Sequence, residues 1–186
     1  MGLKKTLLLH SCCAPCSTIA IERLKDEYNI IVYYYNPNIY PIDEYLKRKN
    51  EQINFINNFN FKNATQIKFI DGDYKDQDFY EAVIGFENEP EMGKRCEKCI
   101  ELRLEASAKM AINVETKNFT TTLSISPHKD TETINKIGKR IAEKYNLNFL
   151  ECNFKEADGY KKSIEISKDY SIYRQKYCGC KYSIRG

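Results

Sequence analysis

The sequence lacks a long hydrophobic run, and it also lacks internal repeats, low-complexity tracts and linker-like segments. The apolar run nearest its start, residues 7–9, is too short for a signal peptide or a membrane span. We therefore expect a cytoplasmic protein that has no membrane partner. Because 186 residues suffice for one hydrophobic core and no linker divides them, we expect a single domain over residues 1–186.

A strong net charge is also absent, since the formal charge of +3 is too small to indicate a class of partner. The distribution of charge is more informative, because residues 170–186 contain no acid and alternate bases with tyrosines. The bases are Arg174, Lys176, Lys181 and Arg185, and the tyrosines are Tyr170, Tyr173, Tyr177 and Tyr182. Bases neutralise phosphates and aromatic rings stack on unpaired bases, so this segment suits a nucleic acid. A solvated amphipathic chain end explains the same composition equally well.

Short apolar runs alternate with helical patterns along the chain. The runs predict strands over residues 6–10, 30–35, 66–70, 119–123 and 147–150. The patterns between and after them predict helices over residues 17–28, 43–59, 77–84, 96–112, 131–145 and 160–167. This alternation is typical of an α/β fold with a doubly wound, five-stranded parallel sheet and helices on both faces. In such sheets ligands bind at the carboxyl ends of the strands.

Eight cysteines form three tight clusters and one singleton. The clusters are Cys12-Cys13-Ala-Pro-Cys16, Cys96-Glu-Lys-Cys99 and Cys178-Gly-Cys180, and Cys152 stands alone. In a reducing cytosol, clustered cysteines are more often ligands or catalysts than structural disulfides. The first cluster directly follows the strand over residues 6–10, where a nucleotide-binding protein would carry a glycine-rich loop. Sulfur in place of glycine favours a metal over a nucleotide phosphate.

The clusters allow more than one chemistry. The first two supply enough thiolates for either tetrahedral zinc or an iron–sulfur cluster, and the spacing does not choose between them. Cys178 and Cys180 could form a strained, easily reduced disulfide or a second chelating pair. Cys152 has no neighbouring cysteine, which favours a core position. Asp73 follows the strand over residues 66–70 and could donate a proton or bind a further metal, although a turn role is equally consistent.

Four motifs, in order along the chain, carry a resemblance to a known family. They are His10-Ser-Cys-Cys-Ala-Pro-Cys16, Lys94-Arg-Cys-Glu-Lys-Cys99, Thr120-Thr-Thr-Leu-Ser-Ile-Ser-Pro127 and Tyr173-Arg-Gln-Lys-Tyr-Cys-Gly-Cys-Lys-Tyr-Ser183. Together they resemble the epoxyqueuosine reductase QueH family over nearly the whole chain. The chain departs from the family pattern at Asn153, where that pattern has an aspartate.

The resemblance implies a Rossmann-like domain of the HUP type and a specific reaction. The enzyme would reduce epoxyqueuosine to queuosine at the wobble position in the anticodon loop of tRNA. This is the last step of queuosine biosynthesis, here without cobalamin and with an unidentified electron donor. The alternatives are a zinc-containing nucleotide-binding or RNA thiolation enzyme of similar fold, and a non-enzymatic RNA-binding module. Against the first, no Ser-Gly-Gly-x-Asp-Ser-like loop follows the first strand.

The resemblance also implies roles for individual residues. Four cysteines would hold a 4Fe–4S cluster, namely Cys12, Cys13, Cys96 and Cys99, with Cys16 as a candidate additional ligand. Cys178 and Cys180 would be the redox-active catalytic pair or contribute to an adjacent second metal ion, iron. Residues that would bind the tRNA carrying epoxyqueuosine are Tyr173, Arg174, Lys176 and Lys181.

Overall fold

The computed structural model describes residues 4–184 and contains one five-stranded sheet in the order β3-β2-β1-β4-β5. All four strand pairs are parallel. The strands are β1 (Lys5–His10), β2 (Tyr28–Tyr34), β3 (Lys68–Asp71), β4 (Asn118–Thr121) and β5 (Asn148–Phe149). This arrangement confirms the predicted doubly wound α/β class.

Helices connect the strands and cover both faces of the sheet. They are α1 (Ala14–Leu24), α2 (Ile42–Asn63), α3 (Asp76–Ala82), α4 (Lys94–Asn113), α5 (Thr131–Tyr145) and α6 (Gly159–Asp169). There are also two short 3₁₀ helices. The first, η1 (Thr122–Ile125), directly follows β4, and the second, η2 (Lys181–Ser183), lies near the end of the described residues. No helix within residues 4–184 is both long and apolar enough to cross a membrane.

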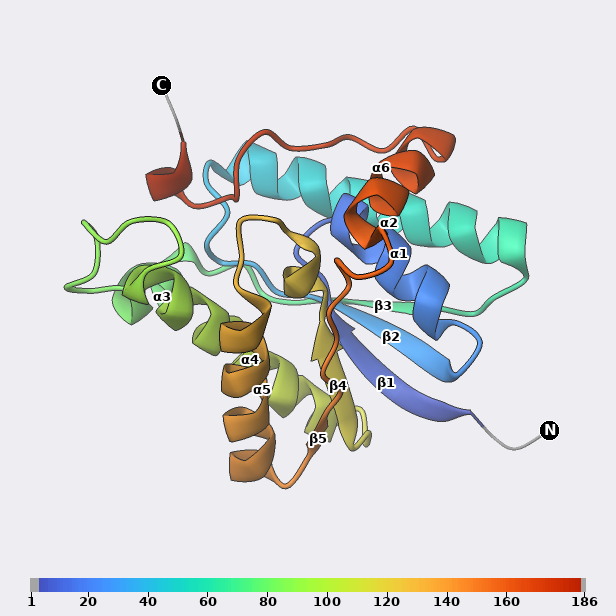
Figure 1. The fold of residues 1–186 in the computed structure, drawn as a ribbon, viewed down its shortest axis with the longest axis horizontal. Helices are drawn as coiled ribbons and strands as arrows, with labels where there is room; N and C mark the ends of the chain where they lie inside the picture. Colours follow the sequence, from blue (N-terminus) through green and yellow to red (C-terminus); the bar gives the residue numbers. More distant parts are fainter. Residues whose placement is uncertain (1–3, 185–186) are drawn as a thin grey trace.

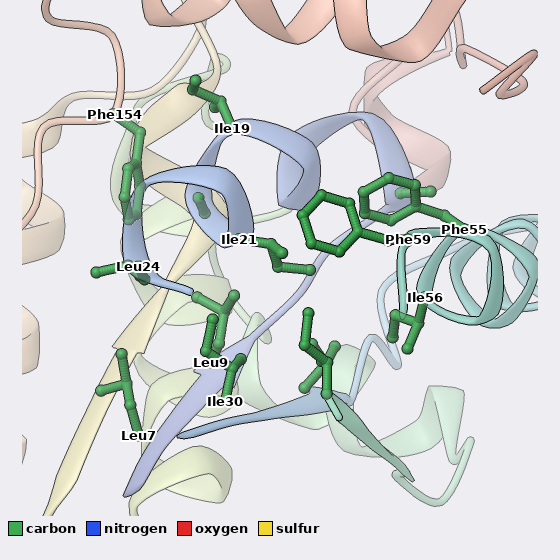
Figure 2. Packing of buried hydrophobic residues seen from close by; sticks show 14 of the residues in the cluster. Leu7, Leu9, Ile19, Ile21, Leu24, Ile30, Phe55, Ile56, Phe59 and Phe154 are labelled. Carbon is green, nitrogen blue, oxygen red and sulfur yellow. The ribbon is translucent and has the colours of Figure 1, made fainter. Parts of the chain in front are cut away.

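The strands separate two hydrophobic cores because successive side chains point to opposite faces of a sheet. In β1, Leu7 and Leu9 pack with α1 and α2, and Leu8 packs with α4 and α5. Figure 1 shows α1, α2 and α6 on one side of the sheet, with α4 and α5 on the other. Figure 2 shows the first core, where Phe55 and Phe59 of α2 lie beside α1.

Two predicted boundaries were wrong for identifiable reasons. The helix predicted over residues 17–28 ends at Leu24, and Tyr28 is the first residue of β2, where it lies opposite Lys5. The strand predicted over residues 119–123 ends at Thr121, whose hydroxyl accepts a hydrogen bond from the backbone N–H of Leu123 at 3.2 Å. This bond caps η1 and turns the chain out of the sheet.

The strand order places a crevice between β1 and β4. The chain moves from β1 to β2 and β3 on one side, and then crosses to β4 and β5 on the other. A reversal of this kind leaves the loops after the two central strands diverging at their carboxyl ends, which is where ligands bind in open parallel sheets. The loop after β1 carries the first cysteine cluster, and the loop after β4 carries Ser126–Lys129.

Candidate active site

Three cysteines converge where β1 passes into α1, and we call Cys12, Cys13 and Cys16 the first thiol group. Their sulfur atoms all lie within 4.8 Å of one another. In the part of the chain that the structure describes, no other three His, Cys, Asp or Glu side chains bring their ligand atoms this close. Cys13 is the N-cap of α1, and Pro15 lies in the first turn of the helix. The local fold therefore gathers these sulfurs at a helix N-terminus, which favours negative charge.

The three thiols differ in acidity. Hydrogen bonds from Cys13 and Cys16 hold the pKa of Cys12 well below its usual value, despite burial. Burial raises the pKa of Cys13 to about 12, and hydrogen bonds with Cys12 and Cys13 raise that of Cys16. The arrangement thus favours the thiolate form on Cys12 over Cys13 and Cys16. Three close sulfur donors fit a thiophilic metal ion or cluster, which would take the remaining thiols as thiolates.

Four further cysteines form a second thiol group, which lines a smaller cavity together with positively charged side chains. Its members are Cys96, Cys99, Cys178 and Cys180. Arg95, Arg103 and Lys129 line the same cavity. Burial raises the pKa of Cys99 to about 11. For Cys178, burial is outweighed by Lys129 and Arg103, so its pKa is lowered.

The C-terminal segment that carries Cys178 and Cys180 is held against α2 by a buried arginine. Arg48 is 2% exposed, and its Nε donates to Glu44 at 2.7 Å. Its Nη1 donates to the backbone oxygen of Cys178 at 3.0 Å, and its Nη2 donates to that of Tyr177 at 3.3 Å. Figure 1 shows the segment running back along α2. Arg48 therefore fixes the position of the last cysteine pair from a distant part of the sequence.

Both thiol groups border one larger cavity of about 400 Å³. Cys12 and Cys16 line it from the first group, and Cys178 lines it from the second. Lys129 lines both cavities, and its Nζ donates to Cys178 Sγ at 3.2 Å. The rest of the wall includes polar and charged side chains, among them Ser126, His128, Tyr160, Arg174, Gln175 and Lys176. The cavity thus offers a ligand reactive sulfur on one side and hydrogen-bonding groups on the other.

The predicted site residues fall into two sets. All seven predicted cysteines belong to the two thiol groups, although Cys96 and Cys99 lie with Cys178 and Cys180 rather than within the Cys12 group. Asp73 is exposed beside Lys75, at 3.7 Å, and lines neither of the two cavities. Cys152 packs against the first hydrophobic core.

The predicted RNA-binding residues all lie on the C-terminal segment, where two are exposed to solvent and two are hydrogen-bonded to other parts of the protein. Lys176 and Lys181 are exposed, and Lys181 Nζ lies 4.5 Å from the centre of the Tyr80 ring. Arg174 donates to Ser167 Oγ at 3.1 Å, and the Tyr173 hydroxyl bonds the Glu44 carboxylate. Arg185, counted among the bases of this segment, lies outside the described residues.

Sequence reasoning missed three residues that shape the site, namely Lys129, Gln175 and Arg48. Gln175 Nε2 donates to Cys13 Sγ at 3.0 Å and so links the C-terminal segment to the first thiol group. Lys129 could have been found from its position, because it follows the predicted fourth strand and the carboxyl ends of parallel strands share one sheet edge. Arg48 gave no signal, since one arginine on a helical face is usually solvated.

The fold and the site together define a Rossmann-like enzyme with a thiol-lined cavity at its switch point. A model of the family described as "Epoxyqueuosine reductase QueH" matches residues 7–186. The chain therefore belongs to the epoxyqueuosine reductase QueH family.

Individual relatives agree with this assignment. An epoxyqueuosine reductase QueH from Haemophilus influenzae is 44% identical over 181 residues, covering 96% of this chain and 71% of that protein. The protein of the same name from Streptococcus pyogenes is 39% identical, covering 99% and 72%. The one from Thermotoga maritima is 37% identical, covering 96% and 90%. Membership confirms the predicted oxidoreductase class and does not favour the zinc-enzyme or RNA-module alternatives.

Proposed function

We propose that this chain reduces epoxyqueuosine to queuosine at the wobble position of tRNA, as the last step of queuosine biosynthesis. The observation that carries the proposal is the meeting of two thiol groups at one open cavity in a chain of this family. Residues 1–186 would act as one cytoplasmic reductase domain, with residues 170–186 as its basic and aromatic RNA-binding segment.

The chemistry needs two electrons and two protons. Both C–O bonds of the epoxide break, a carbon–carbon double bond forms, and the oxygen leaves as water. A dithiol that becomes a disulfide releases two electrons and two protons, so Cys178 and Cys180 balance the reaction. An electron donor of unidentified nature would reduce the disulfide again.

The cofactor in this proposal is a 4Fe–4S cluster held by Cys12, Cys13, Cys96 and Cys99. When bound, it would supply electrons one at a time. The closeness of Cys16 to Cys12 and Cys13 supports Cys16 as an additional or alternative ligand. A second iron next to Cys178 and Cys180 would add a Lewis acid to the site.

The substrate would enter as an unpaired base. Anticodon-loop bases can be splayed out of the stack, and a cavity of about 400 Å³ can take a modified base. Arg174 and Lys176 line this cavity, and Tyr173 and Lys181 lie on the same segment. They would neutralise the phosphates on either side of the bound nucleotide.

Anaerobic purification and reconstitution with iron and sulfide provide the test. We expect bound iron and acid-labile sulfide, and we expect tRNA carrying epoxyqueuosine to yield queuosine when a chemical reductant is supplied. Mass spectrometry of the digested tRNA measures the conversion. Iron-loaded protein that leaves epoxyqueuosine intact would reject the reductase proposal, and a colourless protein with one zinc and no iron would reject the cluster.

A further inference from the structure

We propose that Lys129 is a catalytic residue, which donates hydrogen bonds to the epoxide oxygen of the substrate while it holds the Cys178 sulfur beside that oxygen. This inference rests on the proposed function and names a group that neither the motifs nor the family membership assigns. It starts from the position of Lys129, which lines both the large cavity and the cavity of the second thiol group.

The backbone around Lys129 is fixed on both sides. Its N–H donates to the Ser126 oxygen at 3.2 Å, and its own carbonyl accepts from Lys155 Nζ at 2.5 Å. The next residue, Asp130, caps α5 by accepting from the Thr133 N–H at 2.8 Å. The loop after β4 therefore presents the side chain from a rigid base, as a group that must meet a reacting atom requires.

The charge on Lys129 is balanced by sulfur instead of carboxylate. Within residues 4–184 its Nζ makes no ion pair with Asp or Glu, and its hydrogen-bond acceptor is Cys178 Sγ at 3.2 Å. The amine therefore lies on the cavity wall, bonded to a sulfur that lines the same cavity.

An ammonium has three N–H donors. In the described residues, Lys129 donates one of them to a side chain, that of Cys178. The other two can bond an acceptor in the large cavity, next to the sulfur of Cys178. An epoxide oxygen placed there would put its carbon atoms beside the reducing pair. As the C–O bonds break, negative charge develops on the oxygen, and a fixed cation at that point stabilises it.

The step balances without a further reagent. The Cys178 and Cys180 thiols lose two electrons and two protons and form one S–S bond. The epoxide loses both C–O bonds and gains a double bond, and its oxygen leaves with the two protons as water. Lys129 is unchanged at the end. Queuosine lacks the oxygen that Lys129 would bind, so substrate and product should differ in affinity.

Binding of two matched tRNAs tests the inference. In a Cys180→Ser background, which stops turnover, we expect tRNA with epoxyqueuosine to bind about tenfold more tightly than tRNA with queuosine. Adding Lys129→Met should equalise the two affinities, and Lys129→Arg, which keeps a charged donor, should restore part of the difference. Lys136→Met removes an exposed lysine of α5 and should leave the difference unchanged.

Kinetics in the otherwise unchanged protein give a second readout. Lys129→Met should lower kcat about a hundredfold, with a smaller change in KM, and its thermal unfolding and iron content should match those of the parent. Equal binding of both tRNAs by the parent, or discrimination and kcat that survive Lys129→Met, would overturn the inference. A parent protein that leaves epoxyqueuosine unconverted would instead reject the proposed function on which the inference rests. If Lys129→Met fails to fold, Lys129→Gln takes its place. Its affinities for the two tRNAs and its kcat are then compared with those of Lys129→Arg.

Discussion

The two thiol groups border the same cavity but are built in different ways. The first takes all its sulfurs from residues 12–16, within one loop and the first turn of α1. The second joins a turn of α4 to the C-terminal segment, which Arg48 of α2 holds in place. Local backbone geometry is enough to form the first group, whereas the second exists only when distant parts of the chain have packed together.

The groups also stabilise a thiolate in different ways. In the first, Cys12 is favoured as a thiolate mainly by hydrogen bonds from its neighbours Cys13 and Cys16. In the second, burial is outweighed by nearby cations, Lys129 before Arg103, so the pKa of Cys178 is lowered. Mutually close sulfurs suit metal binding, and a single thiolate beside a cation suits electron and proton transfer. Under the proposed function, this difference fits Cys12 and Cys13 as cluster ligands and Cys178 as a member of the reducing pair.

The largest expected effect follows from breaking the first group. Cys12→Ser and Cys13→Ser should each remove most of the bound iron and sulfide, because serine oxygen is a poor ligand for a cluster that prefers thiolates. Metal analysis of anaerobically reconstituted protein measures the loss. Cys152→Ser is the control, since Cys152 packs against the core and should leave metal content intact. Cys12→Ser protein with full iron and sulfide would remove the first group from the metal centre.

The second prediction separates the two groups. Cys178→Ser should abolish conversion of epoxyqueuosine, because one thiol cannot form the disulfide that releases two electrons. Because Cys178 is not one of the four proposed cluster ligands, the same variant should keep its cluster iron and sulfide. Mass spectrometry of the tRNA and metal analysis give both readouts from one preparation. Conversion by the variant would reject the redox role of Cys178, and loss of the cluster iron and sulfide would make Cys178 a ligand of the metal centre.

Sequence reasoning predicted the parts of the molecule that local pattern determines. The sheet class and the helix over residues 131–145 follow from periodicity, and the helix has the predicted bounds. The position of the first cysteine cluster at the carboxyl edge of the sheet follows from the strand that precedes it. These features depend on residues close together in the sequence, so a pattern can reveal them.

The remainder depends on contacts between distant residues. The family resemblance implied that Cys12 and Cys13 share a cluster with Cys96 and Cys99, and the structure adds Cys16 beside the first pair and Cys178 beside the second. The bond from Lys129 to Cys178 and the bond from Arg48 to the Cys178 carbonyl each connect segments that no local motif relates. A parallel sheet brings loops together at one edge, but side-chain packing decides which of their residues touch.

The third prediction tests the long-range construction of the second group. Arg48→Met should leave Glu44 and two backbone carbonyls without their buried partner, and should lower the free energy of unfolding by about 3 kcal/mol. Urea unfolding measures the change. Lys47→Met, at the neighbouring exposed position, removes the ammonium that lies over the Tyr173 ring and should cost less than about 1 kcal/mol. Equal destabilisation by the two variants would mean that Arg48 does not tether the segment.

The smallest effect concerns the rim of the shared cavity, where Arg174 and Lys176 lie. Lys176 is exposed, so Lys176→Ala should flatten the dependence of log Kd on log salt concentration by about 0.7, because the variant neutralises one phosphate fewer. Arg174 is partly engaged with Ser167 and the Ser163 carbonyl, so Arg174→Ala should change the slope less. Titration of tRNA carrying epoxyqueuosine at several salt concentrations gives the slopes, with Lys136→Ala as the control. Unchanged slopes for both rim variants would place the RNA surface elsewhere, and a larger change for Arg174→Ala would mean that its guanidinium leaves Ser167 when RNA binds.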